Sequence, residues 1–398
     1  KQSSVQYYRI LINMNDHLCA PESCTGCLAC LNVCPQKAIT IIEGFLGEIL
    51  PSIDRDLCID CGACDKVCPS LNSQEKYYPQ ACYAAWTKDN FDYSTSTSGG
   101  LATAMSKQII NGGGVVYGCA AIGINVKHLR CTTIEEIEKL KGSKYVQSNV
   151  CTIYQDIKLD LKNGKKVLFI GTPCQVGGVK SFLKKDYLNL ITVDLICHGV
   201  PSIRSLKDSL SHNIKNIDFR TISHLSFRNH EKGDYCLECK GMTKNRVYFE
   251  FEKGIDYSTS YYPTFFFGNS CRNSCYQCQY AQPQRVSDIT IGDFWGLSDK
   301  LVIEQAQQGI SAVLINTDKG AGFYQTLVDN IHSYPESIDE AVTNNAQLKS
   351  PTIKTQRTKI FRYLCTKMSF ENAFKWTYFD RITKSKLKKI IKKIIYYR

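Results

Sequence analysis

Eight cysteines near the start of the chain stand in two copies of one spacing. The copies are Cys24-x2-Cys27-x2-Cys30-x3-Cys34-Pro35 and Cys58-x2-Cys61-x2-Cys64-x3-Cys68-Pro69. In bacterial ferredoxins three such thiolates bind one iron–sulfur cubane, and the cysteine before proline binds the neighbouring cubane. The sequence therefore predicts two [4Fe–4S] clusters. Their ligands would be Cys24, Cys27, Cys30 and Cys68 for one, and Cys58, Cys61, Cys64 and Cys34 for the other.

Zinc is the competing interpretation of these runs, but two CxxC pairs would suffice for zinc. Two complete copies, each ending in Cys-Pro, favour clusters that exchange single electrons. Cys19 lies outside the first run and is interpreted as structural. The chain has 21 cysteines in 398 residues, whereas disulfide scaffolds are short and secreted. Thiolate-bound metal in a reducing cytoplasm is the expectation.

A second set of cysteines lies in three later motifs. The motifs are GTPCQVGG (171–178), DLICHGVPS (194–202) and CRNSCYQCQYA (271–281). Cys174 and Cys197 each follow an apolar run that reads as a buried strand, and Cys275 and Cys278 form a CxxC pair. Alternation of such strands with helical segments suggests an α/β unit with its site at the strand ends. Convergence of the four cysteines is plausible, but buried core thiols and a zinc CxxC remain the alternative.

The elements that would position these residues fall into four regions. The expected domains are a ferredoxin domain (1–75), two parts of one mixed α/β body (78–165 and 166–330) and a helical C-terminus (331–398). Strands are expected at 38–42, 82–86, 112–119, 166–170 and 190–197, and helices at 101–110 and 133–140. The fold class is therefore α+β for the ferredoxin domain and α/β for the body.

The motifs of the body resemble the coenzyme F420 hydrogenase/dehydrogenase beta-subunit family, which includes chlorophyll-pathway reductases and bacterial members with an added ferredoxin domain. The segments that carry the resemblance are STSGGLATAM (96–105), KGSKYVQS (141–148), the three cysteine motifs and DITIGDFWG (288–296). They occur in family order over roughly residues 78–300. The resemblance implies an FAD-binding body with its own [4Fe–4S] cluster. Its ligands would be Cys174, Cys197, Cys275 and Cys278, although Cys271 is close enough in sequence to replace one.

The resemblance also implies the flavin contacts. They would be Ser98, Gly99, Gly100, Lys144, Tyr145, Thr172 and Gln175. A Gly-containing turn before a helix suits phosphate but usually only caps the helix, and a solvated lysine is as common as a cofactor contact. His198 is the candidate proton donor, and a histidine satisfied by neighbouring groups is an equally good interpretation. Asp293 and Trp295 are expected to pack, and Cys236 and Cys239 are expected to be structural.

The net charge of +12 lies mostly in the tail. Residues 381–398 hold eight Lys and Arg, and without them the net charge is about +4, which gives no basis for nucleic-acid binding. Apolar and lysine residues occupy opposite faces of an expected helix there, which could lie on the inner surface of an anionic membrane or dock on the body. No apolar stretch is long enough to span a membrane.

Together these observations predict an iron–sulfur flavoprotein oxidoreductase. It would pass electrons between ferredoxin-type clusters and FAD and reduce or oxidise a small organic substrate, for which a sugar-related metabolite is the first expectation. The expected redox partner is a protein such as ferredoxin. Two alternatives remain: an F420-type deazaflavin:ferredoxin oxidoreductase, and a non-catalytic electron-transfer subunit of a larger complex. The sequence does not indicate the oligomeric state.

Overall fold

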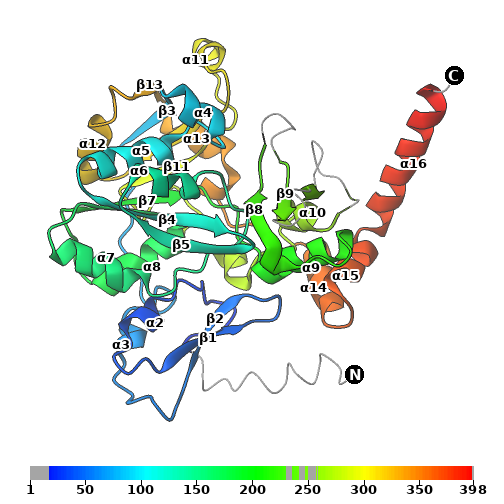
Figure 1. Ribbon diagram of the computed structural model, residues 1–398, viewed down its shortest axis with the longest axis horizontal. Helices are drawn as coiled ribbons and strands as arrows, with labels where there is room; N and C mark the ends of the chain where they lie inside the picture. Colours follow the sequence, from blue (N-terminus) through cyan, green and yellow to red (C-terminus); the bar gives the residue numbers. More distant parts are fainter. Residues whose placement is uncertain (1–17, 230–234, 242–246, 250–256, 258, 397–398) are drawn as a thin grey trace.

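The computed structural model describes all residues except 1–17, 230–234, 242–246, 250–256, 258 and 397–398. An eight-stranded mixed sheet forms the centre of the body, in the order β13-β3-β12-β11-β7-β6-β4-β5 (Figure 1). Its strands are β3 Ala81–Thr87, β4 Val115–Ile122, β5 Asn125–Cys131, β6 Val167–Gly171, β7 Leu190–Leu195, β11 Ile289–Asp293, β12 Ser311–Ile315 and β13 Ile331–Glu336. Strands β4, β6, β7 and β11 run parallel, so their carboxyl ends meet at one edge.

Helices cover both faces of this sheet. They are α4 Asn90–Thr95, α5 Leu101–Asn111, α6 Ile134–Ile137, α7 Ile153–Lys162, α8 Pro173–Leu183, α11 Lys300–Gln305, α12 Asp318–Gln325 and α13 Ile338–Asn344. Alternation along β6 shows how the faces are filled, because Phe169 packs in the core under α7 and α8, whereas Leu168 packs in the core under α5, α6 and α12. The expected strand and helix positions in this region are confirmed within a few residues.

The ferredoxin domain packs directly on this body. It contains α2 Ala29–Val33, α3 Ala63–Lys66 and the antiparallel pair β1 Ile39–Glu43 and β2 Ile49–Ile53. Leu28, Ala29 and Val67 belong to the same hydrophobic core as α7 and α8. Figure 1 shows these two helices between the sheet and the ferredoxin domain. The two parts therefore share one buried interface.

The remaining elements form a smaller lobe. A three-stranded sheet, β8 Ile222–Ser226, β9 Glu238–Gly241 and β10 Val247–Phe249, packs beside α9 Ile203–Asn213 and α10 Tyr261–Phe266. Helices α14 Gln356–Cys365, α15 Phe370–Thr377 and α16 Phe379–Tyr396 follow, and α16 projects away from the body (Figure 1). Cys236 and Cys239 are fully buried, as a structural role requires. None of the helices in the described part of the chain has the length and apolarity needed to cross a bilayer.

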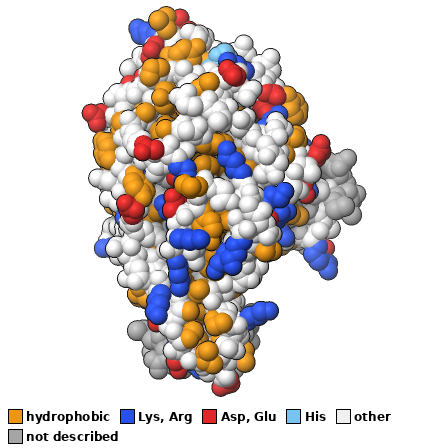
Figure 2. Space-filling model, turned by 90° about the vertical axis from the view of Figure 1, so that its left-hand side faces the viewer, with side chains coloured by type: hydrophobic (Ala, Val, Ile, Leu, Met, Phe, Trp, Pro, Cys, Tyr) orange, Lys and Arg blue, Asp and Glu red, His pale blue; other side chains and the backbone are white. Residues whose placement is uncertain are grey.

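One expectation of the fold needs correction. The region from 331 was expected to be helical, but it begins with β13, whose residues pair with β3 at the edge of the central sheet. The period-2 pattern there is short and interrupted by Pro335, which is tolerated because an edge strand leaves one side unpaired. Figure 2 also shows Lys and Arg side chains gathered across the middle of one face.

Candidate redox site at the strand ends

Two adjoining cavities open at the carboxyl ends of β6, β7 and β11. The four body cysteines predicted as cluster ligands line the first cavity together: Cys174, Cys197, Cys275 and Cys278. The second cavity has a volume of about 320 Å³. Both cavities are lined by Thr172, Cys174, Cys197, His198, Gly199 and Val200. A molecule in the second cavity would therefore touch residues that hold the thiols of the first.

The four body thiols lie close enough to influence one another. The pKa of Cys174 is raised to about 11 and that of Cys275 to about 12, mainly by burial and also by neighbouring thiols. Iron reverses this preference, because a coordinated thiol binds as thiolate. No group of three or more His, Cys, Asp or Glu side chains in the described ranges is spaced for a single metal ion. A cubane distributes its four ligands over four irons, so the shared cavity is the relevant test, and the quartet fits it.

Cys271 lies beside this quartet but does not line the cavity. It is fully buried, and its carbonyl oxygen accepts a hydrogen bond of 2.9 Å from Arg362. Its thiol would be 2.9 Å from a Cβ added to Gly199, whose φ of +113° favours glycine. The structure thus brings together the four predicted ligands and places Cys271 behind them.

The ferredoxin thiols form two groups. Burial is the largest cause of the raised pKa of the Cys30 thiol, and charge on Cys24, Cys27 and Cys68 contributes to it. These four thiols are therefore neighbours. Cys34, Cys58 and Cys64 pack around Ile39 and Ile53 with Cys30, and the exposed Cys61 neighbours Cys64. We call the first group the inner quartet and the second, with Cys61, the outer quartet. In this grouping Cys68 lies with the first run and Cys34 with the second, and the binding of clusters by the two groups stays a prediction.

Cys19 has a position that the sequence did not reveal. Its thiol hydrogen-bonds with the thiols of Cys24 and Cys68, and these contacts raise its own pKa most. The same contact with Cys19 lowers the pKa of Cys68 to about 7. Cys19 therefore adjoins the inner quartet, and its expected structural role stays a prediction. No spacing rule points to it, because it lies five residues before the first motif.

The inner quartet sits against the helix that begins at the body site. A Cβ added to Gly178 of α8 would lie 2.8 Å from Cβ and 3.2 Å from Sγ of Cys27. Charge on Cys174, in the first turn of α8, acts on the Cys27 thiol. Beside this contact Gln74 donates a hydrogen bond of 2.6 Å to the carbonyl oxygen of Gly177. Glycines in α8 thus allow the inner quartet to approach the body quartet closely.

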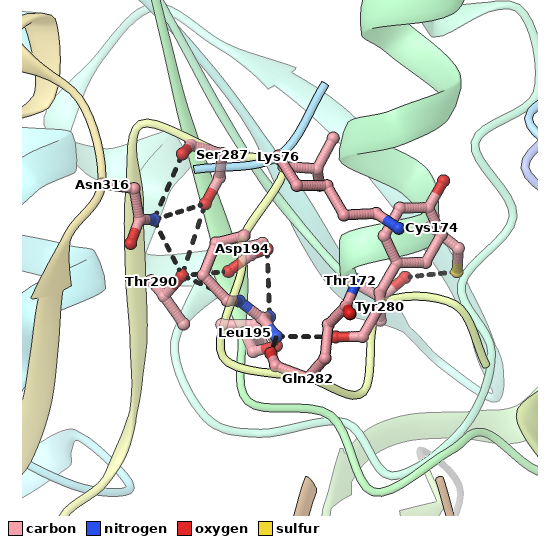
Figure 3. Close-up of polar contacts among 12 residues, drawn as sticks. Lys76, Thr172, Cys174, Asp194, Leu195, Tyr280, Gln282, Ser287, Thr290 and Asn316 are labelled. Carbon is pink, nitrogen blue, oxygen red and sulfur yellow. Dashed lines mark hydrogen bonds and ion pairs between the residues drawn. The ribbon is translucent and has the colours of Figure 1, made fainter. Parts of the chain in front are cut away.

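A buried ion pair lies near the end of β7, where Figure 3 shows Asp194 beside Thr290. Asp194, at the end of β7, pairs with Arg285 over 3.0 Å and accepts a hydrogen bond of 2.6 Å from Thr290 of β11. Arg285 also donates to the carbonyl oxygen of Tyr280 over 2.8 Å. Burial raises the pKa of Cys278, and the charges of Arg285 and Lys76 offset part of this rise. The ion pair therefore connects β7 and β11 with the wall of the thiol cavity, which Arg285 also lines.

The second cavity is lined by most of the expected flavin contacts. They are Ser98, Gly100, Lys144, Tyr145, Thr172 and Gln175. Gly100 has a φ of +76° and begins α5 without a side-chain cap, so the start of the helix faces the cavity with free backbone donors. Gly99 does not line it, because its N–H donates to Ser311 Oγ and a Cβ would lie 2.3 Å from the carbonyl oxygen of Ala85.

Two lysines line this cavity, and Lys144 is the one that has no carboxylate as an ion-pair partner among the described residues. Its ammonium donates to the carbonyl oxygens of Leu140 and Lys141 over 2.7 and 2.8 Å, and no carboxylate of the described residues pairs with it. Burial lowers its pKa to about 8. Lys141, by contrast, pairs with Asp92 and Glu138. An anion beside Lys144 would therefore be stabilised there.

Gln175 and His198 are already engaged within the chain. The Gln175 amide accepts from Thr172 N–H over 3.0 Å and donates to Ser148. His198 lies with Nε2 3.2 Å from the carbonyl oxygen of Phe265, to which it donates, and with Nδ1 2.9 Å from the Gln347 amide, from which it accepts. Burial lowers the pKa of His198, which favours the neutral form of its ring. These contacts favour a positioning role for both residues.

The last two candidates differ in their surroundings. Asp293 lines the second cavity and pairs with Arg228 over 2.8 Å. Trp295 is half exposed and lies outside it. Sequence reasoning missed Gln347 and Thr352, which reach the thiol cavity from beyond residue 340, and Arg272, which lies inside a cysteine motif. Of these three, only Arg272 could have been found from the sequence, because it lies between Cys271 and Cys275.

Comparison with known proteins matches both parts of the chain. Residues 164–340 match the family model for the C terminus of the beta subunit of coenzyme F420 hydrogenase/dehydrogenase, and residues 23–72 match that of the 4Fe-4S dicluster domain. One component of the F420H2 dehydrogenase of Methanosarcina mazei is 22% identical over 379 residues, which cover 89% of this chain and 96% of that protein.

Two further similarities concern single parts or the fold. A ferredoxin 7Fe of Hydrogenibacillus schlegelii is 37% identical over 75 residues, which cover 18% of this chain and 88% of the ferredoxin. A chain in a structure of the F420-reducing [NiFe] hydrogenase complex of Methanosarcina barkeri has a TM-score of 0.45 and 17% identity. It covers 68% of this chain and 91% of its own length.

Proposed function

We propose that the chain is an iron–sulfur flavoprotein oxidoreductase of the coenzyme F420 hydrogenase/dehydrogenase beta-subunit family, whose model residues 164–340 match, with a dicluster ferredoxin domain at residues 23–72. An iron–sulfur electron-transfer role follows from the two family matches. The proposal adds a third cluster on Cys174, Cys197, Cys275 and Cys278, an FAD in the second cavity, and a small organic substrate beside it.

One observation carries the proposal: the second cavity and the thiol cavity share six lining residues. A cofactor in the larger cavity would therefore lie against the loops that hold Cys174 and Cys197. A volume of about 320 Å³ is in the range of ligand sites, and a pure electron adaptor has no use for such a cavity. This favours an enzyme over the alternative of a non-catalytic electron-transfer subunit.

The residues of the cavity fit an anionic dinucleotide. Backbone N–H groups at the start of α5 would bind its pyrophosphate, together with the ammonium of Lys144, which has carbonyl partners but no carboxylate partner among the described residues. FAD, when bound, exchanges electrons singly with clusters and in pairs with organic substrates. His198 would position the Cys197 loop through its bonds to Phe265 and Gln347, because neither ring nitrogen is free to donate a proton to substrate.

Electrons would enter at the outer quartet. Cys61 is exposed there, and Leu57 and Ile59 beside it are 53% and 61% exposed, which suits docking of a redox partner such as ferredoxin. Two electrons, delivered one at a time, and two protons from solvent would reduce the substrate, and oxidation would run the same path in reverse. A cytoplasmic location is part of the proposal, because cubanes need a reducing compartment.

The substrate divides the proposal into two versions. A sugar-related metabolite remains the first. The name of the Methanosarcina mazei relative favours the second, a deazaflavin of the F420 type. Anaerobic assays with reduced F420 as electron donor, followed at its absorbance band, separate them: transfer to the clusters supports the deazaflavin version, and no transfer leaves the metabolite version.

Flavin binding is the direct test of the cavity assignment. Apoprotein prepared anaerobically should quench FAD fluorescence with one site per chain. Lys144→Gln should weaken this binding at least tenfold, about 1.4 kcal/mol, because it removes the cation. Lys139→Gln is the matched control, since Lys139 is exposed on the same segment and does not line the cavity. Absence of FAD binding to the wild-type protein would refute the flavin assignment.

A further inference from the structure

Arg272 is a buried cation with only neutral partners. Its side chain is 3% exposed and donates to the carbonyl oxygens of Cys24 and Ile49, each over 3.0 Å. It also donates to Gln147 Oε1 over 2.6 Å. Two of these partners belong to the ferredoxin domain and one to the body. The guanidinium thus lies across the interface between them.

The other buried arginines of the described residues have carboxylate partners. Arg285 pairs with Asp194 over 3.0 Å, and Arg362 pairs with Glu48 over 3.3 Å. Arg272 has no carboxylate within ion-pair distance among the residues that the structure describes. A buried charge without a counter-charge is strongly unfavourable. The position therefore calls for an anion that the protein side chains do not supply.

Cysteine sites lie on both sides of this cation. On one side, a Cβ added to Gly26, in the loop between Cys24 and Cys27, would lie 2.5 Å from Arg272 Nη1. On the other side, Arg272 lines the thiol cavity of the body, and its charge acts on Cys174 and Cys275. Four thiolates around an oxidised cubane leave a net charge of about −2. Two such clusters would supply the missing counter-charge.

We propose that Arg272 is the shared counter-ion of two [4Fe–4S] clusters, the one on the inner quartet and the one on the body quartet. This inference rests on the proposed clusters. Each cluster gains one electron on reduction, without bond changes, and becomes more negative. A cation between them stabilises both reduced forms, so it raises both reduction potentials and keeps them close. The outer cluster, whose quartet Arg272 does not contact, is the internal reference.

The test is an anaerobic redox titration of the intact protein followed by electron paramagnetic resonance. For the inner and body clusters, Arg272→Gln should lower the ratio of reduced to oxidised cluster at a fixed potential at least tenfold. This corresponds to a reduction potential that is lower by about 59 mV for a one-electron couple. The outer cluster should not change. Its signal is identified from Cys61→Ala, which removes a ligand of that cluster alone. Arg272→Lys, which keeps the charge, should restore most of the shift.

Controls separate charge from packing. Gln74→Ala removes an uncharged contact across the same interface, from Gln74 to Gly177, and should leave all potentials unchanged. Should Arg272→Gln fail to fold, Gln147→Glu decides, because it keeps the 2.6 Å contact and supplies a carboxylate; it should lower both potentials.

The outcomes are distinct from those of the proposed function. Wild-type protein without iron and sulfide at these sites would overturn the clusters themselves. Intact clusters with unchanged potentials in both Arg272→Gln and Gln147→Glu would overturn the counter-ion alone. Equal shifts of all three clusters would overturn it too, because they would indicate a general loosening of the fold.

Discussion

The contact between Gly178 and Cys27 makes a quantitative prediction. Gly178→Ala adds a methyl group 2.8 Å from Cys27 Cβ and 2.9 Å from Tyr154 Oη, and both neighbours are held by the shared core. Ordinary carbon contacts are about 3.5–4.0 Å, so the ferredoxin loop must move by about 1 Å. Overpacking of this kind costs about 1–3 kcal/mol. Alanine in a helix instead gains about 0.5–1 kcal/mol over glycine.

Gly322→Ala provides the matched control. Gly322 lies inside α12, and a Cβ there would meet no atom within 4 Å, so this variant should show only the helix gain. The two variants should therefore differ by about 1–3 kcal/mol, with Gly178→Ala the less stable. Thermal unfolding of the cluster-loaded protein measures the difference. Stopped-flow reduction should show slower transfer from the ferredoxin clusters to the body in Gly178→Ala only. Equal stability and equal rates for the two variants would refute the close approach.

Three further predictions concern the buried charges and the tail. Asp194→Asn should cost about 3–5 kcal/mol in thermal unfolding, because it leaves Arg285 buried without its carboxylate; a cost below about 1 kcal/mol would contradict the ion pair. Burial lowers the pKa of His128 to about 4, below its unfolded value near 6.5. Below about pH 6.5 the unfolded chain therefore binds a proton that the folded protein does not, and the free energy of unfolding decreases by up to about 1.4 kcal/mol for each pH unit of acidification. His128→Gln should flatten this slope between about pH 7 and 5.5. An unchanged slope would exclude His128 as its source. Deletion of residues 381–398 should reduce co-sedimentation with anionic liposomes, since α16 carries the exposed Leu387 and Ile390 with basic neighbours; unchanged pelleting would dispose of membrane contact.

The sequence predicts the cysteine sites because local spacing determines them. Each ferredoxin run brings three ligands together within one loop, and apolar runs before Cys174 and Cys197 mark strand ends that meet in a parallel sheet. The ferredoxin assignments follow from chain geometry over a few residues, and the meeting of Cys174 and Cys197 follows from one topological rule. The full set of four body ligands was implied by the family resemblance.

What the sequence could not predict depends on long-range contacts. Cys19 lies beside the inner quartet, and Gln347 contacts His198 from 149 residues away in the sequence. Arg272 acquires its role only when the ferredoxin domain docks on the body, because its partners lie up to 248 residues distant. The engagement of Gln175 by Ser148 likewise appears only after the fold forms.

Edge pairing explains the misassigned strand. The 331–336 segment has weak alternation and a proline, and it becomes a strand because β3 offers an unpaired edge. The strand propensity of the segment alone does not indicate that it pairs with β3.

Iron and acid-labile sulfide per chain, measured on anaerobically prepared protein, test the central claim that three thiolate quartets form one electron path. The account predicts about twelve irons and twelve sulfides per chain, falling to about eight of each in Cys197→Ala. About eight of each in both proteins would contradict the body cluster, and colourless protein without sulfide would contradict the whole path.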